Sequence, residues 1–99
     1  ARRGDLGACH ALDMPFVFGT LDAPTQDRFA GKGLDAENLA RNMMDAWIAF
    51  AGCADPSHPG IGNWEPFERH KRNTMIFGGE CLLTEDPFAE ERLAIEKLV

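Results

Sequence analysis

The clearest alternation of apolar and polar residues in the chain predicts a helix over residues 36–51. Its apolar side chains recur every three or four residues, which places them on one helical face; they are Ala40, Met43, Met44, Trp47, Ile48 and Ala51. Asp35 is a good N-cap residue, and Gly52 can adopt the left-handed conformation that ends many helices. We therefore expect the helix to lie between Asp35 and Gly52, with its Met and Trp stripe in the core.

Two short segments before this helix are expected to form single turns. The run Met14–Gly19 is apolar, but Pro15 has no N–H to give to a sheet, so the run would make a poor central strand. We interpret it as a buried loop or one helical turn. Residues 24–29 are compatible with another helical turn, which the two glycines that follow would end.

The region after the long helix predicts a β-hairpin over residues 74–83. Thr74–Phe77 and Glu80–Leu83 flank the pair Gly78-Gly79. Glycine accepts the positive φ that two-residue hairpin turns require, so the pair predicts a tight turn between two antiparallel strands.

A last helix is predicted over residues 87–98. Asp86 would be its N-cap and Pro87 its first residue, an arrangement that helix starts favour. The spacing of the apolar residues predicts that Phe88, Ile95 and Leu98 point inward.

Composition limits the chain to one small domain, with no internal repeat or linker that would divide residues 1–99. The chain has 99 residues, is 44% hydrophobic and carries a formal net charge of -6. The acidic balance argues against nucleic-acid or anionic-membrane partners, and no run is long enough to span a membrane. The only serine is Ser57, so no G-x-S-x-G nucleophile motif is present.

The cysteines and histidines form no motif typical of a metal site or a thiol enzyme. Cys9, Cys53 and Cys81 lie far apart, which is typical of free thiols in a reducing compartment, and we expect a cytoplasmic location. A metal site built from Cys9, His10, His58 and His70 is disfavoured, because only the first two are close and neighbouring side chains chelate one ion poorly. The same geometry argues against Cys9 as a nucleophile with His10 as its base. We expect no cofactor and no metal.

The segment Gly7–Gly19 closely resembles the histidine loop of type-B carboxylesterases, the family of para-nitrobenzyl-type esterases and cholinesterases. Its sequence, GACHALDMPFVFG, follows the family pattern G-A-x-H-x-x-[DE]-φ-P-F-V-F-G. Later segments are also similar to family segments: 39–51 with W-x-x-F-A, the loop of 55–67, and the strand at 74–77. Cys53-Ala54 and Glu65 depart from the pattern, and neither departure touches His10.

This resemblance implies the C-terminal portion of an α/β-hydrolase domain of class α/β. His10 would be the general base of a Ser–acid–His triad in a serine carboxylesterase. Asp13 would at most support the histidine loop by hydrogen bonds. The triad serine and acid would lie upstream, in the chain order of these enzymes, so the 99 residues alone are expected to be inactive.

The expected partners are the remainder of the esterase chain and a small-molecule ester substrate. An alternative function is a stand-alone acidic interaction module without catalysis. Under either interpretation, Met43, Trp47, Phe77 and Ile95 need apolar cover, so we expect either self-association or the presence of the complementary piece of the esterase.

Overall fold

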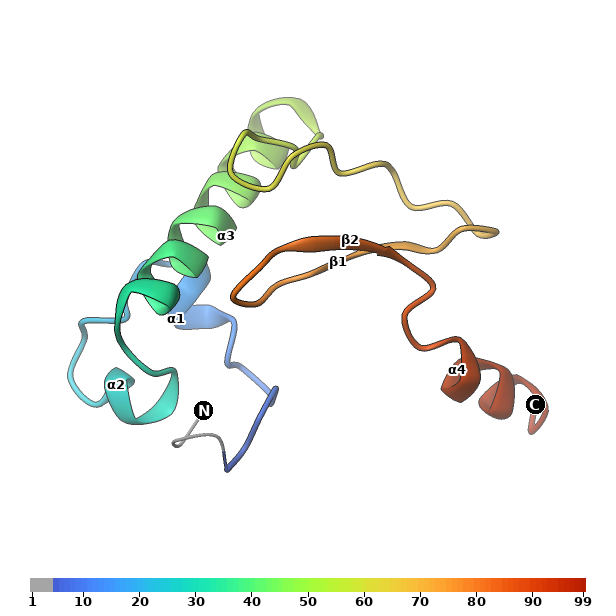
Figure 1. Cartoon of the computed structure of the whole chain (residues 1–99), viewed down its shortest axis with the longest axis horizontal. Coiled ribbons are helices and arrows are strands. Elements are labelled where there is room, and N and C mark those ends of the chain that lie inside the picture. Colours follow the sequence, from blue (N-terminus) through green and yellow to red (C-terminus); the bar gives the residue numbers. More distant parts are fainter. Residues whose placement is uncertain (1–4) are drawn as a thin grey trace.

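The chain is organised along one long helix, as a computed structural model that describes residues 5–99 shows (Figure 1). In chain order the elements are α1 (Met14–Val17), α2 (Gln26–Phe29), α3 (Leu34–Cys53), β1 (Asn73–Ile76), β2 (Leu82–Glu85) and α4 (Ala89–Glu96). These helices, loops and a two-stranded hairpin match the mixture of elements that the sequence predicted. No helix among residues 5–99 is long and apolar enough to cross a membrane.

Helix α3 extends two residues beyond its predicted range at each end, and both predicted end signals are wrong. The N-cap is Gly33, whose φ of 107° few other residues could adopt, and Asp35 lies inside the first helical turn. Gly52 lies within the helix. Ala54 takes the left-handed C-cap conformation, with φ 60° and ψ 20°, and its N–H donates to the carbonyl four residues earlier at 2.7 Å.

The core is small and lies where α1 packs on α3. Phe16 from α1 is buried against Ala40 and Met43 of α3, and Ala46 is fully buried one turn further along. The run 14–19, expected to be a buried loop or one helical turn, thus forms the helical turn α1. The predicted buried stripe is only partly correct, since Ile48 is exposed. The described chain covers only part of the apolar surface of α3.

The hairpin is present, but its connection differs from the prediction. The strands are antiparallel with Met75 opposite Leu83, and residues 77–81 connect them. Neither Gly78 nor Gly79 has a positive φ, so the predicted two-residue turn is wrong. Phe77, predicted as a strand residue, lies in this connection.

Phe77 links the hairpin to the rest of the fold through aromatic contacts. Its ring centroid lies 6.2 Å from that of Trp47 on α3 and 5.8 Å from that of Trp64 in the loop after α3. Both distances lie in the range of favourable aromatic pairs. The side chain therefore joins three segments that are distant in sequence.

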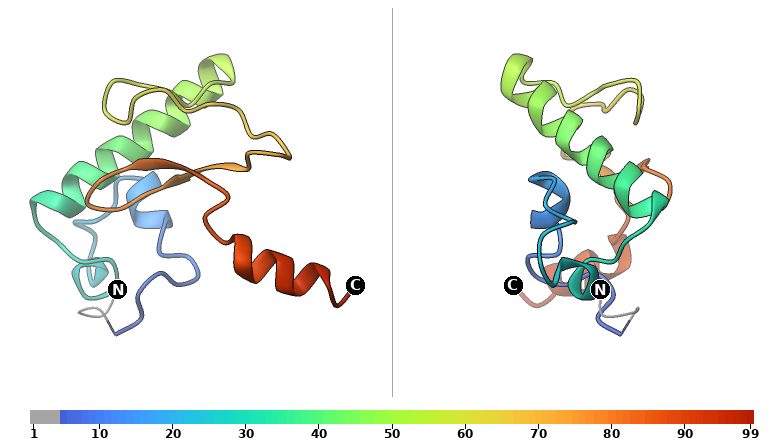
Figure 2. Two further views of the ribbon diagram at one scale, coloured as in Figure 1. Left: turned by 45° about the vertical axis from the view of Figure 1, so that its right-hand side comes forward. Right: turned by 90° about the vertical axis from the view of Figure 1, so that its left-hand side faces the viewer.

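Helix α4 is shorter than predicted and does not bury its apolar side. Asp86 has φ 44° and is not the N-cap, which is Phe88. Phe88, Ile95 and Leu98 are all exposed, so their predicted inward orientation is wrong among the residues described. Figures 1 and 2 show α4 extending away from α3, where no other described element packs on it closely. Helical spacing predicts which side chains share a face, but a partner must be present to bury that face.

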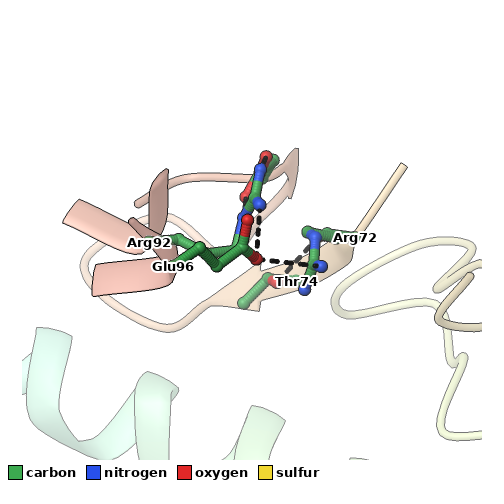
Figure 3. Close-up of polar contacts among 5 residues, drawn as sticks. Arg72, Thr74, Arg92 and Glu96 are labelled. Atoms are coloured by element: carbon green, nitrogen blue, oxygen red, sulfur yellow. Dashed lines mark hydrogen bonds and ion pairs between the residues drawn. The ribbon is translucent and has the colours of Figure 1, made fainter. Parts of the chain in front are cut away.

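Charged side chains connect α4 to the hairpin. Arg92 donates to both carboxylate oxygens of Asp86, at 3.2 and 2.7 Å, and to Glu96 at 2.9 Å. Figure 3 shows Glu96 lying between Arg92 and Arg72, with the Arg72 ion pair at 3.9 Å. The hydrogen bond from Arg92, aided by its charge and by that of Arg72, lowers the pKa of Asp86. The hydrogen bonds that Arg92 gives to Asp86 and Glu96 raise the pKa of Arg92. Asp86 therefore accepts hydrogen bonds from within the helix, at the place where the sequence predicted a cap.

Candidate functional site

His10 lies on a hydrogen-bonded turn that leads directly into α1. The N–H of Leu12 donates to the carbonyl of Cys9 at 3.2 Å, and the N–H of Met14 donates to that of Ala11 at 3.3 Å. Ala11 adopts a left-handed φ of 65° within this turn. His10 is exposed, and its imidazole has no hydrogen-bond partner within residues 5–99. The turn therefore holds the backbone of His10, and its ring nitrogen atoms are free of partners among the described residues.

Asp13 contributes to this turn through its backbone. Its carbonyl accepts hydrogen bonds from the N–H groups of Phe16 at 3.1 Å and Val17 at 2.9 Å. Its exposed carboxylate makes no capping hydrogen bond to α1. Because the side chain of Phe16 is buried on α3, the turn that carries His10 is anchored to the core. Support of the loop by the Asp13 carboxylate stays a prediction.

His58 is occupied by hydrogen bonds that join its loop to α3. Its Nε2 lies 2.9 Å from the carbonyl oxygen of Asn42, and its Nδ1 accepts the N–H of Gly60 at 3.1 Å. An Nδ1 that accepts must be unprotonated, so these partners assign the proton to Nε2, which donates to Asn42. From the sequence, His58 was a candidate only as a metal ligand, and this contact was not predicted. Its spacing from Asn42 in sequence carries no signal of it.

Ser57 is a loop residue engaged in local hydrogen bonds. Its Oγ accepts the N–H of Trp64 at 2.8 Å, and its own N–H donates to Asp55 at 2.9 Å. Hydrogen bonds from Ser57, through its hydroxyl and its N–H, lower the pKa of Asp55. The neighbouring His58 ring is directed to Asn42 and Gly60, so it is not positioned as a base for Ser57.

The remaining residues considered in the sequence do not come together as a site. Within residues 5–99, no three histidine, cysteine or acidic side chains are arranged to hold a metal ion. Cys9 and Cys81 are half-buried and Cys53 is exposed, and all three are free thiols. His10 and His70 are both exposed, but the turn of His10 leads into α1, whose Phe16 is buried in the core.

Known proteins similar to this chain are ester hydrolases. No protein-family model matches the chain. It is 35% identical over 85 residues to para-nitrobenzyl esterase of Bacillus subtilis (strain 168), covering 86% of this chain and 17% of that protein. It is 39% identical over 80 residues to phenmedipham hydrolase of Pseudarthrobacter oxydans, covering 78% of this chain and 16% of that one. The chain thus spans about a sixth of the length of the curated relatives it matches.

Solved structures show the same similarity in three dimensions. A para-nitrobenzyl esterase structure superposes with a TM-score of 0.76 at 34% identity, covering 85% of this chain and 17% of the other. Carboxylesterase EST55 of Geobacillus stearothermophilus gives a TM-score of 0.77 at 33% identity, covering 87% of this chain and 19% of the other. The chain therefore has the fold of a segment of the α/β-hydrolase esterases. Within that class the chain is similar to a segment of para-nitrobenzyl esterase and related carboxylesterases, and the resemblance stated from the sequence is confirmed.

Proposed function

We propose that this chain is the C-terminal, histidine-bearing segment of a serine carboxylesterase that hydrolyses carboxylic esters. The observation that carries the proposal is the placement of His10. It occupies the histidine position of the loop Gly7–Gly19, and it is exposed on a turn that Phe16 anchors to the core. A general base needs this combination of fixed backbone and accessible ring nitrogen.

In the proposed reaction, His10 handles one proton twice. The ring accepts the proton of a serine hydroxyl as the serine oxygen forms a bond to the ester carbonyl carbon. It then donates that proton to the alcohol oxygen as the ester C–O bond breaks. The acyl group is then bound to the serine oxygen as an acyl-enzyme. Water attacks its carbonyl carbon and gives a proton to His10, which passes the proton to the serine oxygen as the acyl bond breaks. The triad serine and acid would belong to the remainder of the esterase. Ser57 is the only serine of the chain, and its hydroxyl accepts a hydrogen bond from the backbone N–H of Trp64 in a loop without the G-x-S-x-G motif.

The test is a chimera in which these 99 residues replace the matching segment of the Bacillus subtilis relative. We expect the chimera to hydrolyse a para-nitrobenzyl ester, and His10→Ala to lower kcat by about 10⁴-fold or more, as loss of a triad member does. His70→Ala is the matched control, because His70 is also an exposed histidine, and it should leave kcat within about twofold of the parent chimera.

The same experiment separates esterase function from the alternative of a non-catalytic acidic module. A folded chimera that hydrolyses the ester equally well with and without His10 would contradict the proposed role of this residue. A folded chimera without any hydrolysis would favour the interaction module. The unmodified 99-residue chain should show no serine-dependent hydrolysis. This is checked by comparing its hydrolysis rate before and after treatment with a serine-directed organophosphate.

A further inference from the structure

Ala11, the residue that follows His10, has a backbone conformation that alanine disfavours. Its φ is 65°, in the left-handed region that glycine and asparagine tolerate and that crowds the Cβ of other residues. Ala11 lies three residues before Met14, where α1 begins, so no helix or strand end accounts for its φ. The other non-glycine residues with a positive φ in the described part of the chain each lie directly before or after a helix or strand; they are Thr25, Ala54, Arg72 and Asp86.

The turn that contains Ala11 has His10 as its other central residue. The N–H of Leu12 donates to the carbonyl of Cys9 at 3.2 Å, which closes a four-residue turn over residues 9–12. Ala11, the second central residue, has a positive φ, and His10, the first, does not. This combination is that of a type II turn, which usually has glycine at the second central position. The turn therefore forms although an alanine occupies the position that favours glycine.

The type of turn sets the backbone of His10. The first central residue has a ψ of about +120° in a type II turn and about −30° in a type I turn, so the peptide between His10 and Ala11 faces opposite ways in the two. The rotamers open to a side chain depend on the φ and ψ of its own residue. The sign of φ at Ala11 is therefore coupled to the orientations that the His10 imidazole can adopt.

Contacts on both sides hold Ala11 in the left-handed conformation. The hydrogen bond between Leu12 and Cys9 closes the turn, and the carbonyl of Ala11 accepts the N–H of Met14 at 3.3 Å. The chain then enters α1, whose Phe16 is buried against α3, and both views of Figure 2 show α1 beside α3. A disfavoured backbone conformation persists only where its surroundings impose it, and such residues concentrate at functional sites.

We propose that Ala11 is a positioning residue for ester hydrolysis, and that its left-handed backbone sets the orientation in which the His10 imidazole meets the serine hydroxyl. The inference rests on the proposed function of His10. The methyl side chain of Ala11 has no group that takes part in the reaction, so it acts through the backbone of His10. A general base must lie within hydrogen-bond reach of the proton that it takes. Loss of the positioning therefore slows proton transfer and leaves substrate binding unchanged.

The experiment compares three substitutions of Ala11 in the chimera with the Bacillus subtilis relative. Ala11→Gly and Ala11→Asn introduce residues that tolerate a positive φ, whereas Ala11→Val introduces a β-branched residue that strongly disfavours it. Asparagine and valine are both larger than alanine, so this pair separates the effect of backbone conformation from that of side-chain size. We measure kcat and KM for the para-nitrobenzyl ester well below the Tm of each variant.

We expect Ala11→Val to lower kcat by about 10-fold to 100-fold, as a displaced catalytic group does, and to leave KM within about threefold. Ala11→Gly and Ala11→Asn should retain kcat within about threefold, since both accept the left-handed conformation. A lower Tm for Ala11→Val with an unchanged kcat indicates a purely structural role and overturns the proposal. Equal losses of kcat in Ala11→Asn and Ala11→Val also overturn it, because side-chain size would then explain both.

The His10→Ala chimera separates this proposal from the proposed function. Full activity of His10→Ala contradicts the catalytic role of His10. An inactive His10→Ala together with an unchanged kcat in Ala11→Val contradicts only the positioning role of Ala11.

NMR of the unmodified 99-residue chain tests the turn without any measurement of activity. A type II turn brings the Hα of the first central residue close to the N–H of the second, and a type I turn moves them apart. We expect a strong NOE between the Hα of His10 and the N–H of Ala11, retained in Ala11→Gly. A weak NOE in the unmodified chain overturns the proposal even if Ala11→Val does not fold.

Discussion

The end of α3 offers a quantitative test, because two nearby residues have backbone conformations that their residue types do not favour. Ala54 adopts the left-handed C-cap conformation at φ 60°, whereas Gly52 sits in helical backbone. We predict that Ala54→Gly and Gly52→Ala each stabilise the chain. The pair exchanges the residue types at two positions without altering charge.

The magnitude for Ala54→Gly follows from two opposing terms. The left-handed conformation costs an alanine about 1–2 kcal/mol, and glycine removes this cost. The unfolded chain gains about 0.4–1 kcal/mol of conformational freedom with the extra glycine. The net gain is about 0.5–1 kcal/mol, which corresponds to a rise in Tm of roughly 3–6 °C for a domain of this length.

The magnitude for Gly52→Ala has one main term. No atom outside the helix backbone lies within 4 Å of the Cβ that alanine would add, so the substitution meets no steric obstacle. Alanine is favoured over glycine within a helix by about 0.5–1 kcal/mol. The position is in the last turn, where helices fray, so we expect the lower part of that range.

The assay is thermal and urea unfolding of each variant, followed by circular dichroism at 222 nm. The prediction from sequence alone, that Gly52 is the left-handed residue after the helix, gives the opposite sign: alanine there would be strained and would lower the Tm. A lower Tm for Gly52→Ala, or a lower Tm for Ala54→Gly, refutes the helix end described above. A variant with the two substitutions combined should show about the sum of the two shifts only if the sites are independent.

Two further predictions concern contacts that hold the outer segments. His58→Ala removes two hydrogen bonds that join its loop to α3 and should destabilise the chain by about 1–3 kcal/mol in urea unfolding; His70→Ala should change it by less than about 0.5 kcal/mol, and equal effects would contradict the assigned contact. The pKa of Asp86 is lowered in the fold, chiefly by the hydrogen bond from Arg92. Its contribution is therefore complete above the unfolded pKa of about 3.9 and is lost as the pH falls through the lower folded value. Amide protection factors in α4 should decrease over this acidic range, and Asp86→Asn should lower them at neutral pH and reduce their acid dependence, because only the Glu96 contacts of Arg92 then remain. An unchanged acid profile in the variant would refute the role of this carboxylate.

The sequence gives a strong indication of elements whose apolar spacing is regular and a weak one of where they end. The three- and four-residue spacing along 36–51 predicted α3 correctly, because that spacing places side chains on one face of any helix. Helix ends depend on the φ of single residues, and the surrounding chain can impose a left-handed φ on Ala54 while leaving Gly52 helical. The hairpin shows the same limit. Gly78-Gly79 correctly predicted where the hairpin lies along the chain, but the connection between its strands is longer than two residues. Phe77 lies in that connection and makes aromatic contacts with Trp47 and Trp64.

Some features of the candidate site could be predicted from the sequence and others could not. The pattern around His10 was specific enough to indicate a resemblance to esterases, and the similarity to known esterases over most of the chain confirms that resemblance. The contacts of His58 with Asn42 and Gly60 could not be read from the sequence, since they join residues that only the fold brings together. The role of His10 itself stays a prediction that the chimera tests.

The sequence by itself determined the resemblance to carboxylesterases and the long amphipathic helix, because both depend on the local order and spacing of residues. Tertiary structure alone decided which apolar residues are covered. Phe16 is buried because α1 folds back onto α3, whereas Ile48, on the stripe predicted to be buried, stays exposed. Burial requires a partner surface, and hydrophobic spacing along a chain cannot state whether that surface lies within the same 99 residues.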